Sequence, residues 1–250
     1  RDGCWSRGLG DVYKRQINPG EGLEKNCYLI TRYLRAVFGK SKKAMLGPDI
    51  SHRRTLVKSL VRNKRVREEI DNLSEGNERR KVQLTKKAHR YANEICSDLN
   101  YSILSLLASG FTWFWNTRYE GLHTKNLEKI KAISKENALI YLPCHRSHID
   151  YCALTYLLYE NGLMVPQVAA GNNLNLPFLG SILRGAGAVF MRRSFMSNPL
   201  YSIVFFEHIM SLMIRGSSIE FFPEGGRSRT GFSLPSRPGL LSLTIRSFAS

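Results

Sequence analysis

Residues 138–150 read ALIYLPCHRSHID, and this stretch decides the fold of the chain. Its first five residues are apolar and a proline follows them, which is typical of a short buried strand. Residues 151–159, directly after the stretch, have the pattern of a helix. The sequence therefore predicts a strand, a tight turn and a helix, which together form the repeating unit of an α/β domain.

Three further stretches predict strands of the same domain. They are residues 165–169, 188–191 and 218–222, and residues 198–215 have helical character. Strands that alternate with helices argue for an α/β fold with a central sheet flanked by helices. We expect this domain to cover residues 120–250.

The preceding part of the chain, residues 17–119, is predicted to be helical. Residues 51–90 are basic and helical in character, and a break is expected at the Ser-Glu-Gly-Asn sequence of residues 74–77. A second long helix is expected from residue 78 towards residue 115. Residues 1–16 have no periodicity and resemble an adapter-derived, non-native leader, so we exclude them from the fold.

The charge of the chain is its most unusual bulk property. Among 250 residues, 37 are Lys or Arg and 20 are Asp or Glu, so the net charge is +17. This charge favours anionic partners, namely phosphate esters, acidic lipid headgroups or nucleic acid, without choosing among them. The five cysteines are scattered with no C-x-x-C spacing, which gives no support to a zinc ribbon or a thioredoxin-type site.

Polar residues of catalytic type follow three of the predicted strands, where open α/β sheets place their sites. In the first group, His145 and Asp150 lie five positions apart across the strand-to-helix turn, so the carboxylate can reach the imidazole. Asp150 would hold one tautomer while the other ring nitrogen takes a proton. Two alternatives stay open. Ser147 or Asp150 could merely cap the helix, or His145, His148 and Asp150 could bind a metal, although no fourth ligand is obvious.

The second group is a pair of adjacent arginines, Arg192 and Arg193, at the end of the strand over residues 188–191. Successive strand residues point to opposite faces, so one arginine is expected to face the site and the other a carboxylate or solvent. A guanidinium group can bind phosphate through two hydrogen bonds. The alternative is that both arginines are simply solvated.

The third group follows the strand over residues 218–222 and combines two glycines with several hydrogen-bond donors. Its members are Gly225, Gly226, Arg227, Ser228 and Arg229. Paired glycines let the backbone approach a ligand and turn N–H groups towards it, so the segment indicates an anion cradle. A glycine-rich surface turn is the alternative. The segment is neither a P-loop nor a nucleophile elbow, so direct attack by a substrate hydroxyl fits better than a covalent enzyme intermediate.

In this order and spacing, the three groups resemble the glycerophospholipid acyltransferase superfamily. Residues 145–150 match its H-x-x-x-x-D block, residues 187–193 resemble its G-x-x-x-x-R-R block, and residues 222–228 match its F-P-E-G-x-R-S block. The sequences His-Arg-Ser-His-x-Asp and Glu-Gly-Gly-Arg-Ser-Arg-Thr-Gly are most similar to the bacterial glycerol-3-phosphate 1-O-acyltransferases. The resemblance covers most of the chain after residue 16.

The resemblance implies an acyltransferase-type sheet and the first step of phospholipid synthesis. A fatty acyl group would pass from coenzyme A or acyl carrier protein to the 1-hydroxyl of sn-glycerol 3-phosphate, without a cofactor or a metal. His145 would be the general base, Asp150 would steady the imidazolium, and Glu224 would be a buried carboxylate that positions arginines. The implied substrate-binding residues are Arg192, Arg193, Glu224, Gly225, Gly226, Arg227 and Ser228.

The resemblance also implies where the enzyme works and where this chain departs from the family. The fourth block of the family is expected beyond residue 250, and residues 236–239 read SRPG in place of a Pro-Lys-x-Gly pattern, so we expect a C-terminally incomplete domain. The basic helices and the aromatic run over residues 111–115 fit peripheral attachment to an anionic membrane, the cytoplasmic face of a bacterial inner membrane. Packing of the aromatic run on the α/β domain is the alternative.

Competing functions remain at this stage. A lysophosphatidate or dihydroxyacetone-phosphate acyltransferase would use the same groups, and a non-catalytic module could bind anionic lipid or nucleic acid. No nucleic-acid partner is expected, because no recognised nucleic-acid-binding motif is present.

Overall fold

The computed structural model describes residues 45–47, 52–119, 122, 124–147, 149–192 and 197–249, with side chains described as far as residue 246. The predicted leader over residues 1–16 lies outside these ranges, and so do His148 and Arg193. No helix in the described ranges is both long and apolar enough to cross a membrane.

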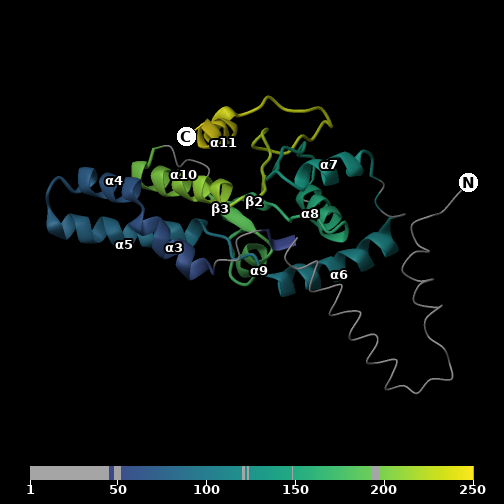
Figure 1. The fold of residues 1–250 in the computed structure, drawn as a ribbon, viewed down its shortest axis with the longest axis horizontal. Helices are drawn as coiled ribbons and strands as arrows, with labels where there is room; N and C mark the ends of the chain where they lie inside the picture. Colours follow the sequence, from purple (N-terminus) through teal and green to yellow (C-terminus); the bar gives the residue numbers. More distant parts are fainter. Residues whose placement is uncertain are drawn as a thin grey trace, which may run out of the picture. The chain divides into compact units, whose positions relative to one another are not determined.

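The described chain is a parallel sheet with helices around it (Figure 1). The helices are α3 (Arg53–Arg62), α4 (Lys64–Ser74), α5 (Glu78–Ile95), α6 (Tyr101–Arg118), α7 (Leu127–Ser134), α8 (Asp150–Glu160), α9 (Leu179–Gly185), α10 (Pro199–Ile214) and α11 (Pro238–Ala249), with a short 3₁₀ helix, η1 (Asn172–Leu174). The strands are β1 (Ile140–Tyr141), β2 (Gln167–Gly171), β3 (Ala188–Met191) and β4 (Ile219–Glu220). The predicted α/β fold is thus confirmed.

The order of the strands, β1-β4-β2-β3, determines which loops meet. All three neighbouring pairs are parallel, so the carboxyl ends of the strands lie at one edge of the sheet. The loops that follow β1 and β4 are adjacent because these strands pair, with Tyr141 opposite Glu220. The sequence therefore brings the first and third polar groups together, although 79 positions separate Ile140 from Ile219 along the chain.

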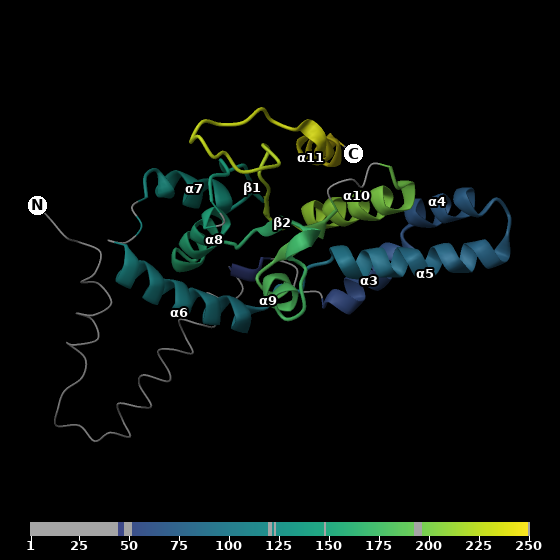
Figure 2. The same ribbon diagram turned by 180° about the vertical axis from the view of Figure 1, so that it is seen from behind.

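The main hydrophobic core lies between α10 and the helices α3, α4 and α5. Figures 1 and 2 show these four helices gathered on one side of the strands, with α6 to α9 on the other. Tyr201 and Phe205 of α10 are fully buried, and Ile95 of α5 and Val189 of β3 join the same cluster. The start of α10 is fixed by Asn198, whose side chain accepts a hydrogen bond from the Tyr201 N–H.

The long helix predicted from residue 78 towards residue 115 is wrong, because the structure has two helices there. α5 ends at Ile95 and α6 begins at Tyr101. The backbone N–H groups of Asp98 and Asn100 donate to the carbonyl oxygens of Arg184 and Gly185, at 3.0 and 2.9 Å. These bonds to the end of α9 hold the segment extended, and a helical register would break them.

The predicted basic helical stretch is also divided once more than expected. Asn63 has extended backbone angles and separates α3 from α4. Its side chain accepts a hydrogen bond from the Arg65 N–H and donates another to Glu207 of α10, at 2.8 and 2.7 Å. Glu207 is buried, so it needs a hydrogen-bond partner, and Asn63 supplies one. This hydrogen bond offsets the helical hydrogen bonds that are lost at the break between α3 and α4.

Three helices, α7, α9 and α11, were not among the predicted elements. α9 is only seven residues long and includes Gly180 and Gly185, which hide its apolar period. A Cβ at Gly185 would clash with the Cδ1 atom of Ile103, so glycine allows the close approach of α9 to α6. The domain boundary near residue 119 stays a prediction.

Candidate active site

The candidate active site forms where the loops after β1 and β4 meet at the carboxyl edge of the sheet. His145 lies in the first loop and Ser228 in the second, and the Ser228 N–H donates to the His145 carbonyl oxygen at 2.8 Å. Asp150 is the first residue of α8. The two loops are therefore joined directly at the histidine.

His145 and Asp150 form a hydrogen-bonded pair. The Nδ1 atom of His145 lies 3.2 Å from the Oδ2 atom of Asp150, and both side chains are largely buried, with 15% and 22% of their surface exposed. The same oxygen accepts hydrogen bonds from the N–H groups of Arg146 and Ser147, at 2.6 and 2.7 Å. Asp150 thus orders the turn before α8 and contacts the imidazole, whereas the start of α8 itself has no side-chain cap.

The hydrogen bonds keep Asp150 ionised. Burial raises the pKa of this carboxyl, but the bonds from Ser147, Arg146 and His145 outweigh burial and hold the pKa below its usual value. The His145 ring also packs against the Phe222 ring, with centroids 4.1 Å apart. The imidazole is therefore held on one side by a carboxylate and on another by an aromatic ring.

The loop after β4 is shaped by a glycine. Gly225 has a φ of +64°, and a Cβ at this position would lie 2.9 Å from the Cδ atom of Arg237. The Arg237 N–H donates to the Pro223 carbonyl oxygen at 2.7 Å, which draws Arg237 into the site. At Gly226 a Cβ would meet nothing within 4 Å, so this glycine leaves open space.

Three arginines of this region line one cavity, and all three are exposed to solvent. They are Arg227, Arg229 and Arg237. Ser228, between the first two, is buried, and its Oγ atom has no hydrogen-bond partner in the described part of the chain. This arrangement of guanidinium groups can bind a phosphate group.

Glu224 is buried, as expected, but its observed contact differs from the expected one. Its Oε2 atom accepts a hydrogen bond from the Leu234 N–H at 3.2 Å. The carboxylate thus fixes the loop that leads from the third polar group to Arg237. Glu224 shapes the backbone around the arginines, and no ion pair between Glu224 and an arginine is found among the described residues.

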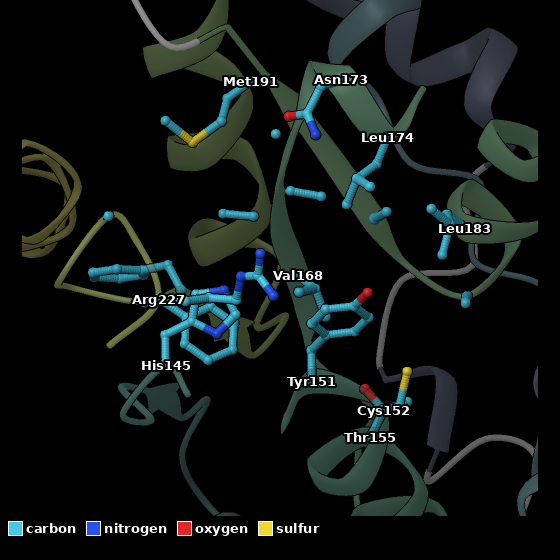
Figure 3. Close-up of a pocket in the computed structure, with 18 of the residues that line it drawn as sticks. His145, Tyr151, Cys152, Thr155, Val168, Asn173, Leu174, Leu183, Met191 and Arg227 are labelled. Carbon is cyan, nitrogen blue, oxygen red and sulfur yellow. The ribbon is translucent and has the colours of Figure 1, made fainter. Parts of the chain in front are cut away.

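The cavity has a volume of about 970 Å³, with a polar end and an apolar end. Figure 3 shows His145 and Arg227 at one end, and Leu174 and Leu183 at the other. Further apolar side chains come from α6, among them Leu104 and Leu107. The shape suits an amphiphilic ligand whose polar head lies beside the histidine and whose chain lies between α6 and α9.

Arg192 is placed away from this cavity. Its Nε and Nη2 atoms donate to the two carboxylate oxygens of Glu94 on α5, at 2.7 and 2.6 Å. Its guanidinium carbon lies 5.0 Å from the centroid of the Tyr91 ring and 4.8 Å from that of Tyr201. One arginine of the pair was expected to face the site and the other a carboxylate or solvent. Arg192 faces a carboxylate, and Arg193 lies outside the described residues.

The aromatic run over residues 111–115 packs mainly on the rest of the structure. Trp115 is 4% exposed and Phe111 lines the cavity, and both rings lie near Tyr156 of α8, with centroids 6.5 and 6.4 Å away. Trp113 is the outward-facing member, with 65% of its surface exposed. The packing alternative therefore accounts for most of this run.

Sequence reasoning missed several residues of the cavity. Tyr151, Cys152 and Thr155 enter it from the first turns of α8, directly after Asp150 (Figure 3). A helix that begins at Asp150 places residues 151, 152 and 155 in its first two turns, so their helical spacing was a usable signal. In the described ranges, no group of three or more His, Cys, Asp or Glu side chains could hold a metal ion.

Comparisons with known proteins agree with this geometry. A family model described as Acyltransferase matches residues 122–249. The chain is 48% identical over 232 residues to a glycerol-3-phosphate acyltransferase of Pseudomonas aeruginosa, a match that covers 93% of this chain and 28% of that protein. Proteins of the same name from Ectopseudomonas mendocina and Pseudomonas putida are 47% and 46% identical, with the same coverage. The chain therefore spans about 28% of the length of these relatives.

Proposed function

Because this chain belongs to the acyltransferase family, we propose that it carries the catalytic segment of a glycerol-3-phosphate 1-O-acyltransferase. The observation that carries the proposal is the His145–Asp150 pair at the polar end of a long amphiphilic cavity. A general base, a cationic region and an apolar channel are the three parts that transfer of a fatty acyl group to a phosphorylated alcohol needs.

The proposed reaction uses His145 as a general base. Its Nε2 atom takes the proton of the substrate 1-hydroxyl while Nδ1 remains hydrogen-bonded to Asp150. The alkoxide oxygen attacks the carbonyl carbon of the acyl thioester, and the carbon–sulfur bond then breaks. The departing thiolate takes the proton back from the imidazolium, so the products are the ester and a thiol. Asp150 offsets the positive charge that His145 carries between the two proton transfers.

The acceptor phosphate is proposed to bind at the cationic end of the cavity. Arg227 lines the cavity at this end together with the histidine, and Gly225, Gly226 and Ser228 shape the same loop. Arg193 is proposed as a further phosphate ligand on the family resemblance alone. The observed pairing of Arg192 with Glu94 gives Arg192 a separate, structural contact.

The acyl donor is proposed to be a thioester of coenzyme A or acyl carrier protein. Its hydrocarbon chain would lie among the leucines of α6 and α9, where burial of apolar surface contributes about 25 cal/mol per Å². The exposed arginines at the other end would contact the phosphate groups that both carriers possess. No cofactor is part of the proposal.

We further propose that the protein works at an anionic membrane surface, as a peripheral protein on the cytoplasmic face of a bacterial inner membrane. Helices α3 to α5 expose many basic side chains, among them Lys58, Lys86 and Lys87. The exposed Trp113 could contribute at the interface. The product is a single-chain amphiphile, and a membrane would receive it.

The function is tested with His145→Ala and Asp150→Asn in two settings. One is the chain alone, and the other is a hybrid in which this chain replaces the matching segment of the Pseudomonas aeruginosa relative. Acylation of glycerol 3-phosphate by palmitoyl-coenzyme A is measured in detergent or lipid. We expect kcat to fall by roughly 10²- to 10⁴-fold with His145→Ala and less with Asp150→Asn, with little change in KM.

Equal rates in the parent hybrid and its His145→Ala variant would exclude His145 as the base. Transfer to lysophosphatidate or dihydroxyacetone phosphate in place of glycerol 3-phosphate would correct the acceptor. If the parent hybrid binds anionic vesicles yet forms no product, the non-catalytic alternative would replace the proposed function.

A further inference from the structure

Glu220 is a buried carboxyl group that the proposed reaction leaves unused. It lies on β4 between its register partners Tyr141 of β1 and Val168 of β2. Its exposed fraction is 0%, and neither Oε1 nor Oε2 has a hydrogen-bond partner in the described part of the chain. A glutamate in such an environment is rare, because burial without a partner costs free energy that only a specific role offsets.

The groups that face Glu220 identify its neighbourhood. Tyr141 of β1 is its register partner, Asp150 and Cys152 at the start of α8 interact with it electrostatically, and β2 contributes the apolar Val168. Burial, and then the negative charge of Asp150, raise the pKa of Glu220 to about 8. The pKa values of Tyr141 and Cys152 are also raised, so both stay neutral at pH 7. Glu220 is therefore a neutral, proton-bearing group that interacts electrostatically with the ionised Asp150.

Only one carboxylate oxygen of Asp150 accepts the hydrogen bonds described above. Its three hydrogen bonds, from His145, Arg146 and Ser147, all end on Oδ2. No donor to its other oxygen, Oδ1, is found among the described residues. Glu220, whose two buried carboxyl oxygens have no hydrogen-bond partner among the described residues, interacts electrostatically with this carboxylate. Catalytic sites often contain two carboxyl groups whose different environments keep one ionised and the other protonated.

We propose that Glu220 is a positioning residue for the His145–Asp150 pair, and that its neutral O–H donates to Asp150 Oδ1 through one enclosed water molecule. This inference rests on the proposed function. The donor holds the carboxylate from behind while the turn and the histidine hold Oδ2, so Asp150 presents a fixed oxygen to Nδ1. A charged Glu220 would instead repel Asp150 in a region of low dielectric constant.

The first test follows protonation and needs no enzymatic activity. The ring signals of His145, identified by their loss in His145→Ala, are recorded by NMR from pH 5 to pH 9.5. We expect a step near pH 8 as Glu220 ionises close by, which Glu220→Gln abolishes. Glu207→Gln is the matched control, because Glu207 is also a buried carboxylate but pairs with Asn63 and Arg65 away from the site. A step that survives in Glu220→Gln, or no step in the parent chain, overturns the proposal.

The second test separates positioning from simple packing. In Glu220→Gln the amide can still donate to Asp150, so kcat should stay within about threefold of the parent value. In Glu220→Met the shape is kept but the donor is lost, so we expect kcat to fall about tenfold with KM for glycerol 3-phosphate unchanged. Equal kcat values in the two variants would mean that Glu220 only fills space.

The outcomes also separate the two proposals. A parent hybrid without acyl transfer would remove the proposed function, and the NMR step would still decide whether Glu220 is coupled to the pair. If Glu220→Met fails to fold, the Glu220→Gln variant decides through both its NMR titration and its kcat.

Discussion

At the scale of single residues, Arg192 was expected to bind the substrate, but its environment is that of a structural residue. It binds both oxygens of Glu94 and lies against Tyr91 and Tyr201, so three neighbours from α5 and α10 hold one guanidinium group. The hydrogen bonds that Arg192 donates to Glu94 raise the pKa of Arg192 further above its usual value. The planar guanidinium suits this site, and a lysine ammonium cannot make both contacts.

Arg192→Lys is therefore expected to destabilise the fold by about 1 kcal/mol, since the pair is partly solvent-exposed, which corresponds to a fall in Tm of about 2–4 °C. The melting temperature is followed by circular dichroism. Arg65→Lys is the control and should change Tm less, because Arg65 makes a single 3.3 Å contact with Glu207. An unchanged Tm with a large rise in KM for glycerol 3-phosphate would instead make Arg192 a substrate ligand.

At the scale of elements, the break between α5 and α6 determines where the cavity wall stands. α6 begins after Asn100, whose side chain accepts a hydrogen bond from the Ser102 N–H at 2.8 Å. The first turns of α6 carry Leu104, Leu107 and Ala108, which line the cavity. A continuous helix through residue 100 would aim these side chains elsewhere, so the predicted single helix could not have formed this cavity.

Asn100→Ala is expected to lower the free energy of unfolding by about 1 kcal/mol through loss of the helix cap. It should also lower the rate of acyl transfer, because the start of α6 frays into the cavity wall. Asn77 caps α5, and its side chain accepts a hydrogen bond from the Arg80 N–H. Asn77→Ala removes this cap at a point away from the cavity. We expect it to lower Tm by a similar amount without changing the rate. Equal rates in the two variants would argue against a role of α6 in substrate binding.

At the scale of the whole molecule, positive charge is the dominant property. The net charge is +17, and basic side chains cover exposed positions of α3 to α5 in addition to the arginines of the cavity. Opposite charges on a membrane would concentrate the protein where its product partitions. Each basic side chain near such a surface contributes about 1 kcal/mol, and salt screens the attraction.

We expect the protein to cosediment with vesicles that contain phosphatidylglycerol at low salt and to be released at about 0.5 M salt. Replacing Lys86, Lys87 and Arg90 of α5 with glutamine should weaken this binding roughly tenfold or more. Vesicles of phosphatidylcholine alone are the control. Equal binding to both kinds of vesicle, or binding that salt leaves unchanged, would contradict an electrostatic attachment.

The sequence by itself determined the features that depend on near neighbours. The apolar runs before residue 143 and around residues 188–191 and 218–222 predicted β1, β3 and β4, because strand formation responds to local apolar content and flanking turn residues. The contact between His145 and Asp150 was predictable for the same reason, since one turn joins them. The glutamate within the apolar run 218–222 could have been recognised from the sequence as a buried carboxyl group, but it was not.

Only the tertiary structure decided the features that depend on residues far apart in the chain. Glu94 and Arg192 are 98 positions apart, and Asn63 and Glu207 are 144 apart, so neither pair has a local pattern. The break at residues 96–100 exists because α9 supplies carbonyl oxygens to it, and Arg237 enters the cavity because Pro223 binds its N–H. Such contacts form only after packing fixes the distance between elements, and the same packing leaves Glu220 fully buried on β4.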